Sequence, residues 1–127
     1  AVSDNKGFSV NLPHRKSFSP DAAYYTGRPM GAEFFEGAPV FAAEVRSKSD
    51  YKSDYGAKAE NEMRQKRADY FATGTLVVWD VDVLRGNAVR VYRATDPDVP
   101  QVFQRGEVAD AEPAVPRWRM PVDDLFE

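Results

Sequence analysis

The sequence predicts an α/β (α+β) fold in which a mixed β-sheet packs against one main helix. Strand-like segments occupy both ends of the chain, and one helix-like stretch without proline, residues 53–73, separates them. After this stretch, residues 76–83 form a strongly apolar strand-like segment, and residues 88–94, beyond a short turn, alternate apolar and polar positions. Strands, one helix and further strands in this order are typical of a sheet with a helix packed on it.

Length and composition indicate a single globular domain covering residues 1–127. The chain has 127 residues, which is enough for one domain and too few for two of ordinary size. Hydrophobic residues make up 43% of the chain and aromatic residues 13%, so a core can form and disorder is disfavoured.

The residue types that the chain lacks limit which crosslinks and metal sites it can form. The chain has no cysteine and one histidine, His14, which excludes disulfides, thiolate metal sites and sites with several histidines. A metal would need oxygen ligands, which suits magnesium or manganese. The absence of cysteine fits the cytoplasm, and no apolar run approaches the roughly 20 residues that cross a bilayer. The net charge of −3 argues mildly against general polyanion binding.

In the N-terminal half, three strands are expected. Residues 7–12 alternate and end at a proline, residues 14–21 form a basic, turn-rich link, and residues 22–27 form a second strand. Glycine and proline mark residues 28–39 as a loop or hairpin connection. The third strand, 40–45, is rich in apolar residues and is therefore expected in the middle of the sheet.

Residues 53–73 predict the helix. Ser53 or Asp54 can cap its start, and Gly74 can end it. One moderately apolar stripe recurs at spacings of three or four, through Tyr55, Ala59, Met63, Arg67 and Tyr70.

The C-terminal half predicts further strands and a tail. Residues 76–83 form a strong strand, residues 85–87 a tight turn, and residues 88–94 its antiparallel partner. Residues 95–100 read as a loop. Residues 101–126 read as a short strand, a turn and an extended, proline-marked tail.

A carboxylate inside the apolar third strand is the most informative feature. Glu44 lies near the end of this strand, and Asp21 begins the second strand, so neighbouring strands would bring both to one end of the sheet. Two close carboxylates repel unless they share a proton or a cation, and a divalent metal resolves the conflict. Arg46 lies two residues on and faces the same side. Ordinary alternatives stay open: a turn-starting Asp21 and a simple ion pair between Glu44 and Arg46.

Five segments, in order, resemble a known family: "SPDAAYY", "GAPVFAAEVRSKSD", "KRADYFATGTLVVWDVD", "VRVYRA" and "VPRWRMPVDDLF". Together they are similar to the Uma family of restriction endonuclease-like proteins, which belongs to the PD-(D/E)XK nuclease superfamily. The resemblance runs from about Gly7 to Phe126. It implies a restriction-endonuclease-like mixed sheet with one main packed helix.

The resemblance also implies a site. In that superfamily, the aspartate of Pro-Asp and a glutamate on the next strand bind magnesium, which implies Asp21 and Glu44, with the backbone carbonyl of Val45 as a further ligand. The family's lysine lies on the following helix, four residues before a tyrosine, which implies Lys66. Arg46 occupies the superfamily's usual lysine position and is the competing candidate.

The chain departs from the family pattern in two informative places. Members often carry Pro-Asp at the start of the third strand, where this chain has Pro39 and Val40. Members also usually carry an N-terminal helical segment that can supply another acidic residue, and we expect this domain to lack it.

Other polar and aromatic residues have simpler interpretations. Asp80 and Asp82 alternate on one strand, and we expect them on an exposed sheet face or strand end rather than in a metal site. Trp79 is expected in the core, and Trp118 and Phe126 are expected to fasten the tail to the sheet.

The charged run of residues 63–70 has two interpretations. Arg64, Lys66 and Arg67 could touch a phosphate backbone, but apart from Lys66 a solvated helix face with pairs four residues apart is the default. His14 is expected on the surface.

Three functions are compatible with these residues. The first is a metal-dependent DNA endonuclease, a hydrolase that cleaves phosphodiester bonds with magnesium or manganese. The second is a catalytically weak or inactive nuclease-fold domain that binds nucleic acid or a protein. The third, a small-molecule enzyme with paired carboxylates, has no positive support. DNA is the expected partner, no membrane partner is expected, and a homodimer is left open.

Overall fold

The part of the chain that the structure describes contains eleven short strands, one main helix and a terminal 3₁₀ turn. The computed structural model describes residues 2–3, 7–26, 34–46, 56–83 and 86–126. In chain order, its elements are β1 (Val2–Ser3), β2 (Gly7–Leu12), β3 (Arg15–Phe18), β4 (Ala22–Tyr24), β5 (Phe34–Glu36), β6 (Phe41–Val45), α2 (Ala57–Ala72), β7 (Val77–Asp82), β8 (Ala88–Arg93), β9 (Asp96–Gln104), β10 (Val108–Asp110), β11 (Arg119–Pro121) and η1 (Val122–Leu125).

A six-stranded mixed sheet organises the domain, in the order β1-β4-β6-β7-β8-β9. Strands β6 and β7 run parallel, and every other pair is antiparallel. A parallel pair needs a crossover, and α2 lies in the sequence between these two strands. The expected α+β fold is confirmed, and its two most apolar strands lie side by side in the middle of the sheet.

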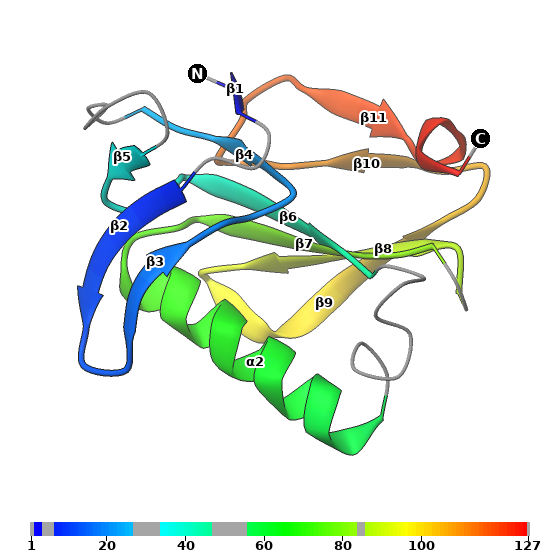
Figure 1. The fold of residues 1–127 in the computed structure, drawn as a ribbon. Helices are drawn as coiled ribbons and strands as arrows, with labels where there is room; N and C mark the ends of the chain where they lie inside the picture. Colours follow the sequence, from blue (N-terminus) through cyan, green and yellow to red (C-terminus); the bar gives the residue numbers. More distant parts are fainter. Residues whose placement is uncertain (1, 4–6, 27–33, 47–55, 84–85, 127) are drawn as a thin grey trace.

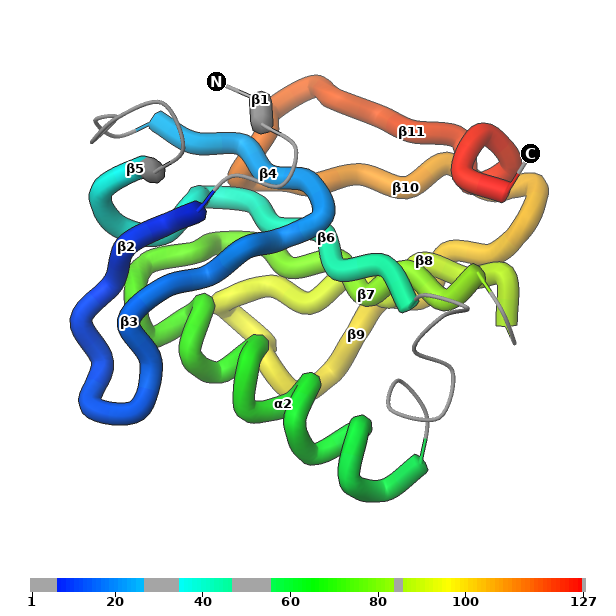
Figure 2. The backbone as a smooth tube through the Cα atoms, in the orientation of Figure 1, coloured from blue at the N-terminus to red at the C-terminus, as the bar shows by residue number. Residues whose placement is uncertain are grey.

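Each face of the sheet is covered by a different part of the chain. Helix α2 and the small sheet β3-β2-β5 lie on one side, and the β10–β11 hairpin with η1 lies on the other (Figure 1). Figure 2 shows the same separation along the backbone, with the red C-terminal segment far from the green helix. Covering on both sides explains why all six residues of β7 are buried.

Alternation along β6 and β7 divides the core into two clusters. Phe41, Ala43 and Trp79 face the C-terminal layer, where they pack with Ala109 and Val122. The intervening residues face the helix, together with side chains from β2, β3 and α2; this second cluster contains Phe8, Phe18, Ala23, Tyr25, Ala42, Tyr70 and Val78. The side of the sheet on which a residue of β6 lies therefore follows from whether its number is odd or even.

Aromatic stacking attaches the tail, as expected. Trp79 is 2% exposed, and its ring stacks on Trp118 at 5.1 Å and meets Phe41 edge-on at 5.2 Å. Its Nε1 donates to the carbonyl of Asp110 at 3.0 Å. Phe126 packs half-buried against the same cluster. The roles predicted for these three aromatic residues are confirmed.

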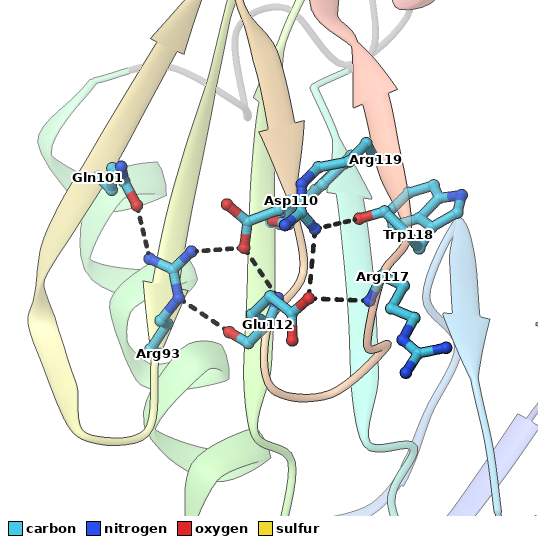
Figure 3. A network of polar contacts seen from close by, with 8 residues as sticks. Arg93, Gln101, Asp110, Glu112, Arg117, Trp118 and Arg119 are labelled. Carbon is cyan, nitrogen blue, oxygen red and sulfur yellow. Dashed lines mark hydrogen bonds and ion pairs between the residues drawn. The ribbon is translucent and has the colours of Figure 1, made fainter.

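A network of hydrogen bonds also holds the C-terminal tail to the sheet (Figure 3). The guanidinium of Arg93, on β8, donates to Gln101 Oε1 at 2.9 Å, to the Glu112 carbonyl at 2.9 Å and to Asp110 Oδ1 at 3.0 Å. Glu112 in turn accepts from Arg119 at 3.2 Å. One side chain thus joins β8, β9 and the segment that follows β10.

Helix α2 begins later than predicted. Gly56, with φ of 102°, precedes its first residue, and the predicted caps Ser53 and Asp54 lie outside the described residues. Gly74, with φ of 107°, follows the end of the helix, as expected for a residue that must adopt a left-handed conformation. Of the predicted stripe, Ala59 and Tyr70 are buried, and Met63 and Arg67 are half-buried; Tyr55 lies outside the described residues. No helix in the described ranges is long and apolar enough to cross a membrane.

Two strands, and the first part of a third, arise where loops or links were expected; the remainder of the third, residues 101–104, was predicted as a short strand. Residues 15–18 pair with β2, residues 34–36 pair with its other edge, and residues 96–104 pair with β8. The last segment contains Pro97 and Pro100, which disfavour a central strand but are tolerated at a sheet edge, where β9 lies.

Candidate active site

Glu44 lies at the end of β6, on the side of the sheet that faces the helix. Its Oε1 accepts from Lys66 Nζ at 2.5 Å, and its Oε2 accepts from the Tyr70 hydroxyl at 3.0 Å. Lys66 and Tyr70 are four residues apart on α2, so both side chains emerge on one face of the helix. The structure thus places Lys66 against Glu44 as expected, while its catalytic role stays a prediction.

The Glu44 carboxyl is only partly solvated. Its side chain is 18% exposed, and burial is the main reason that its pKa is raised above the usual value of 4.5. Lys66 and Tyr70 stabilise the charged form and oppose the rise, while the negative charge of Asp21 adds to it. Repulsion between the two carboxylates therefore acts in the expected direction, although burial is the larger cause.

Asp21 lies beside Glu44 because β4 and β6 are antiparallel neighbours. The strand register pairs Ala22 with Ala43, and the backbone N–H of Asp21 donates to the Ala43 carbonyl at 3.1 Å. Asp21 Oδ2 accepts from the backbone N–H of Val45 at 2.7 Å. This bond fixes the exposed carboxylate of Asp21 at the end of β6, next to the residue after Glu44.

Arg46 lies in a buried ion-pair network at some remove from Lys66. Its side chain is 2% exposed and donates to Asp80 Oδ1 and Oδ2 at 3.1 and 3.0 Å and to Glu60 Oε1 at 2.7 Å. Burial opposes its charge, but these two carboxylates outweigh burial and raise the pKa of the guanidinium. The same contact lowers the pKa of Glu60. Arg46 therefore joins β6 to β7 and α2.

The expectation that Asp80 and Asp82 are exposed is wrong. They are 2% and 3% exposed, because both faces of β7 are covered. A buried carboxylate requires a partner. Asp80 pairs with Arg46, and Asp82 approaches Arg90 at 3.9 Å.

A further buried carboxylate, Asp69, was not singled out from the sequence. It accepts from His14 Nε2 at 2.8 Å, from Arg15 Nε at 2.7 Å and from Gln65 at 2.8 Å. Burial would raise the pKa of Asp69, but these hydrogen bonds outweigh it and lower the pKa. His14 is exposed as expected, yet it helps to hold the β2–β3 hairpin against α2. The sequence signal was an aspartate next to the stripe residue Tyr70.

A cavity of about 390 Å³ opens between α2 and the ends of β6 and β7. Volumes of this size are typical of small-ligand sites. The lining residues are Arg15, Glu44, Val45, Arg46, Ala59, Glu62, Met63, Lys66, Arg67, Tyr70, Val78, Trp79 and Asp80.

The donor set near the cavity fits a magnesium ion. Among the described residues there is no cluster of three or more histidine, cysteine, aspartate or glutamate side chains. Asp21 and Glu44 supply carboxylate oxygens, and magnesium commonly uses one or two carboxylates while keeping several waters. Hydrogen bonds to both Glu44 oxygens show that this carboxylate is already oriented.

Comparisons with known proteins agree with this geometry. The fold is similar to the crystal structure of "a putative nuclease belonging to DUF820" from Anabaena variabilis, with a TM-score of 0.71, 19% identity and coverage of 98% of this chain. The chain spans 66% of the length of that protein. A comparison with curated proteins found no match.

The sheet and helix thus share the fold of this neighbour. The Uma2 family model, described as "Putative restriction endonuclease", matches residues 2–123. The chain therefore belongs to the Uma2 family.

Proposed function

We propose that the domain is a magnesium-dependent endonuclease that hydrolyses phosphodiester bonds of DNA. The observation that carries the proposal is the contact of Lys66 with Glu44 at the strand end where Asp21 is also held. A lysine paired with a carboxylate in the lining of a cavity, with a second carboxylate on the neighbouring strand, is suited to a reaction in which negative charge develops on a phosphate.

Two carboxylates would hold the ion. Asp21 and Glu44 would be its side-chain ligands, and the carbonyl of Val45 would be a third. A bound magnesium ion neutralises charge on the phosphate and lowers the pKa of a coordinated water. The hydrogen bond from Tyr70 would keep Glu44 in place while Lys66 interacts with substrate.

Lys66 would donate hydrogen bonds to the attacking water and to a non-bridging phosphate oxygen. Its side chain is 31% exposed and so has access to both the cavity and Glu44. Hydrolysis adds the water oxygen to phosphorus and transfers a proton to the departing sugar oxygen. Arg46 would support this site indirectly, because its guanidinium is occupied by Asp80 and Glu60.

The alternative is a nuclease-fold domain that binds nucleic acid or a protein without cleaving. Two observations favour it: Val40 stands where family members often carry an aspartate, and the net charge is −3. The two functions differ in whether strand cleavage depends on Lys66.

A plasmid-nicking assay tests the proposal. Supercoiled DNA is incubated with the protein in magnesium, in manganese and in EDTA. Wild type is expected to nick in either metal, and Lys66→Ala is expected to lose about 10²-fold or more of the rate. Lys58→Ala is the matched control, since Lys58 is exposed on the same helix and does not line the cavity. Equal rates for wild type and Lys66→Ala, or no metal-dependent nicking, would contradict the proposal.

A further inference from the structure

Arg67 has hydrogen-bonding capacity that the fold does not use. Its Nε and Nη1 are buried, and neither finds an acceptor among the residues that the structure describes. The guanidinium carbon lies 4.0 Å from the centre of the Tyr92 ring, so the group lies over this ring of β8. Buried donors without an acceptor are uncommon in native proteins and call for an explanation, such as a bound ion or water.

The other cations around the cavity are all neutralised by carboxylates. Lys66 pairs with Glu44 at 2.5 Å, and Arg15 pairs with Asp69 at 2.7 Å. Arg46 pairs with Asp80 and Glu60. Within the described part of the chain, Arg67 is the cavity-lining cation that has an aromatic ring in place of a carboxylate. Its positive charge is therefore available to an anion in the cavity.

We infer that Arg67 binds a phosphate group of the substrate within this cavity. A guanidinium offers paired N–H donors that match two oxygens of one phosphate, and stacking on an aromatic ring leaves those donors at the edge of the plane. The cavity, about 390 Å³, has room for a phosphodiester and part of its sugars. An arriving phosphate supplies acceptors that the described residues do not. Glu60 lies near enough for the charge of Arg67 to help lower its pKa, but its carboxylate is paired with Arg46.

This inference rests on the proposed nuclease function for the identity of the ligand, a phosphodiester of a nucleic-acid strand. Arg67 follows Lys66 directly, so one segment of α2 would present the catalytic lysine and an anchor for phosphate. Arg67 would be a substrate-binding residue and take no part in proton transfer. Tyr92 would act as a positioning residue by keeping the guanidinium plane fixed.

The test uses small probes that carry at most one phosphate group. Thymidylyl-thymidine carries one phosphodiester, sodium phosphate is the inorganic anion, and thymidine is the uncharged control. Each is titrated, without divalent metal, into ¹⁵N-labelled wild type, Arg67→Met, Arg67→Lys and Arg64→Ala. The Nε–Hε resonance of Arg67 reports directly on its guanidinium. Arg64 is the matched control, since it lies one turn earlier on α2, is exposed and bonds to Asn61.

Thymidylyl-thymidine is expected to shift the Arg67 resonance in wild type, whereas thymidine is not. Binding should weaken about tenfold in Arg67→Met and less in Arg67→Lys, and it should be unchanged in Arg64→Ala. Melting temperatures of the four proteins separate lost binding from lost folding, and Arg67→Lys keeps the test valid if the methionine variant unfolds.

Three results would overturn the inference: no binding of thymidylyl-thymidine to wild type, equal binding by wild type and Arg67→Met or Arg67→Lys, or binding of inorganic phosphate alone. The plasmid assay is independent of these titrations. Loss of nicking activity in that assay with retained Arg67-dependent binding would refute the endonuclease and leave the phosphate site. Lys66-dependent nicking with Arg67-independent binding would do the reverse.

Discussion

Replacing Arg46 by methionine is expected to destabilise the domain severely. The Arg46 and Asp80 side chains are 2% and 3% exposed, so the substitution leaves a carboxylate buried without its cation. Breaking a buried pair in this way costs about 3–5 kcal/mol. A domain of ordinary stability has about 5–15 kcal/mol in total. The variant is therefore expected to be near its unfolding threshold at 37 °C.

The loss of stability in Arg46→Met is measured by urea denaturation, alongside two control variants. Arg46→Met with Asp80→Asn should be more stable than Arg46→Met alone, because the unpaired buried charge is gone. Arg119→Ala breaks an exposed pair with Glu112, and its midpoint should stay near that of wild type. A loss below about 1 kcal/mol for Arg46→Met, or no recovery in the double variant, would refute the structural role assigned to Arg46.

Three further predictions concern stability. The raised pKa of Glu44 means that, above the unfolded value of 4.5, the folded state keeps a proton that the unfolded state has lost. The contribution of Glu44 to the free energy of unfolding therefore falls as the pH rises through this window. The free energy of unfolding of wild type relative to Glu44→Gln, measured by urea titration, should accordingly decline toward neutral pH. The pKa of Asp69 is lowered in the folded state, so this carboxylate stabilises the fold above its unfolded-state pKa of 3.8. That stabilisation is lost as the pH falls toward the folded-state pKa. Asp69→Asn should remove this loss of stability in acid, as followed by the same urea titrations. If stability changed with pH in the opposite direction for either residue, the pKa shift described for that residue would be contradicted. Arg93→Ala should cost about 1–3 kcal/mol in urea denaturation, because three hydrogen bonds are lost, two to the C-terminal layer and one to β9; an unchanged midpoint would show that this network is dispensable.

Much of the central fold could be predicted because local pattern and tertiary environment agree there. Strands β6 and β7 are apolar and lie between two covering layers, and the proline-free stretch of α2 ends at a glycine. The strands that were missed are those whose pairing depends on distant partners. The first part of strand β9, residues 96–100, is largely exposed and contains two prolines, so its strand conformation could not be predicted from local pattern.

The residues of the candidate site likewise include some that could be predicted from the sequence and others that could not. The placement of Lys66 against Glu44 followed from the family resemblance, since periodicity alone would treat a lysine on a charged helix as solvated. Asp80 was expected to be exposed because its partner, Arg46, is 34 residues away in the sequence. Asp69 was overlooked for a similar reason: two of its three donors come from a hairpin more than fifty residues earlier. A buried charge can be recognised from sequence only when its partner is known.

The central claim is that Asp21 and Glu44 bind a divalent ion, and the melting temperature measured with and without magnesium tests it most directly. At about ten times its dissociation constant, an ion bound only by the folded state adds about 1.4 kcal/mol, or a rise of about 4–6 °C. Asp21→Asn retains an oxygen that can accept from the Val45 N–H. This variant should therefore fold normally without metal and lose the rise. The account predicts a rise in wild type and none in Asp21→Asn; a wild-type melting temperature that millimolar magnesium and manganese leave unchanged would contradict it.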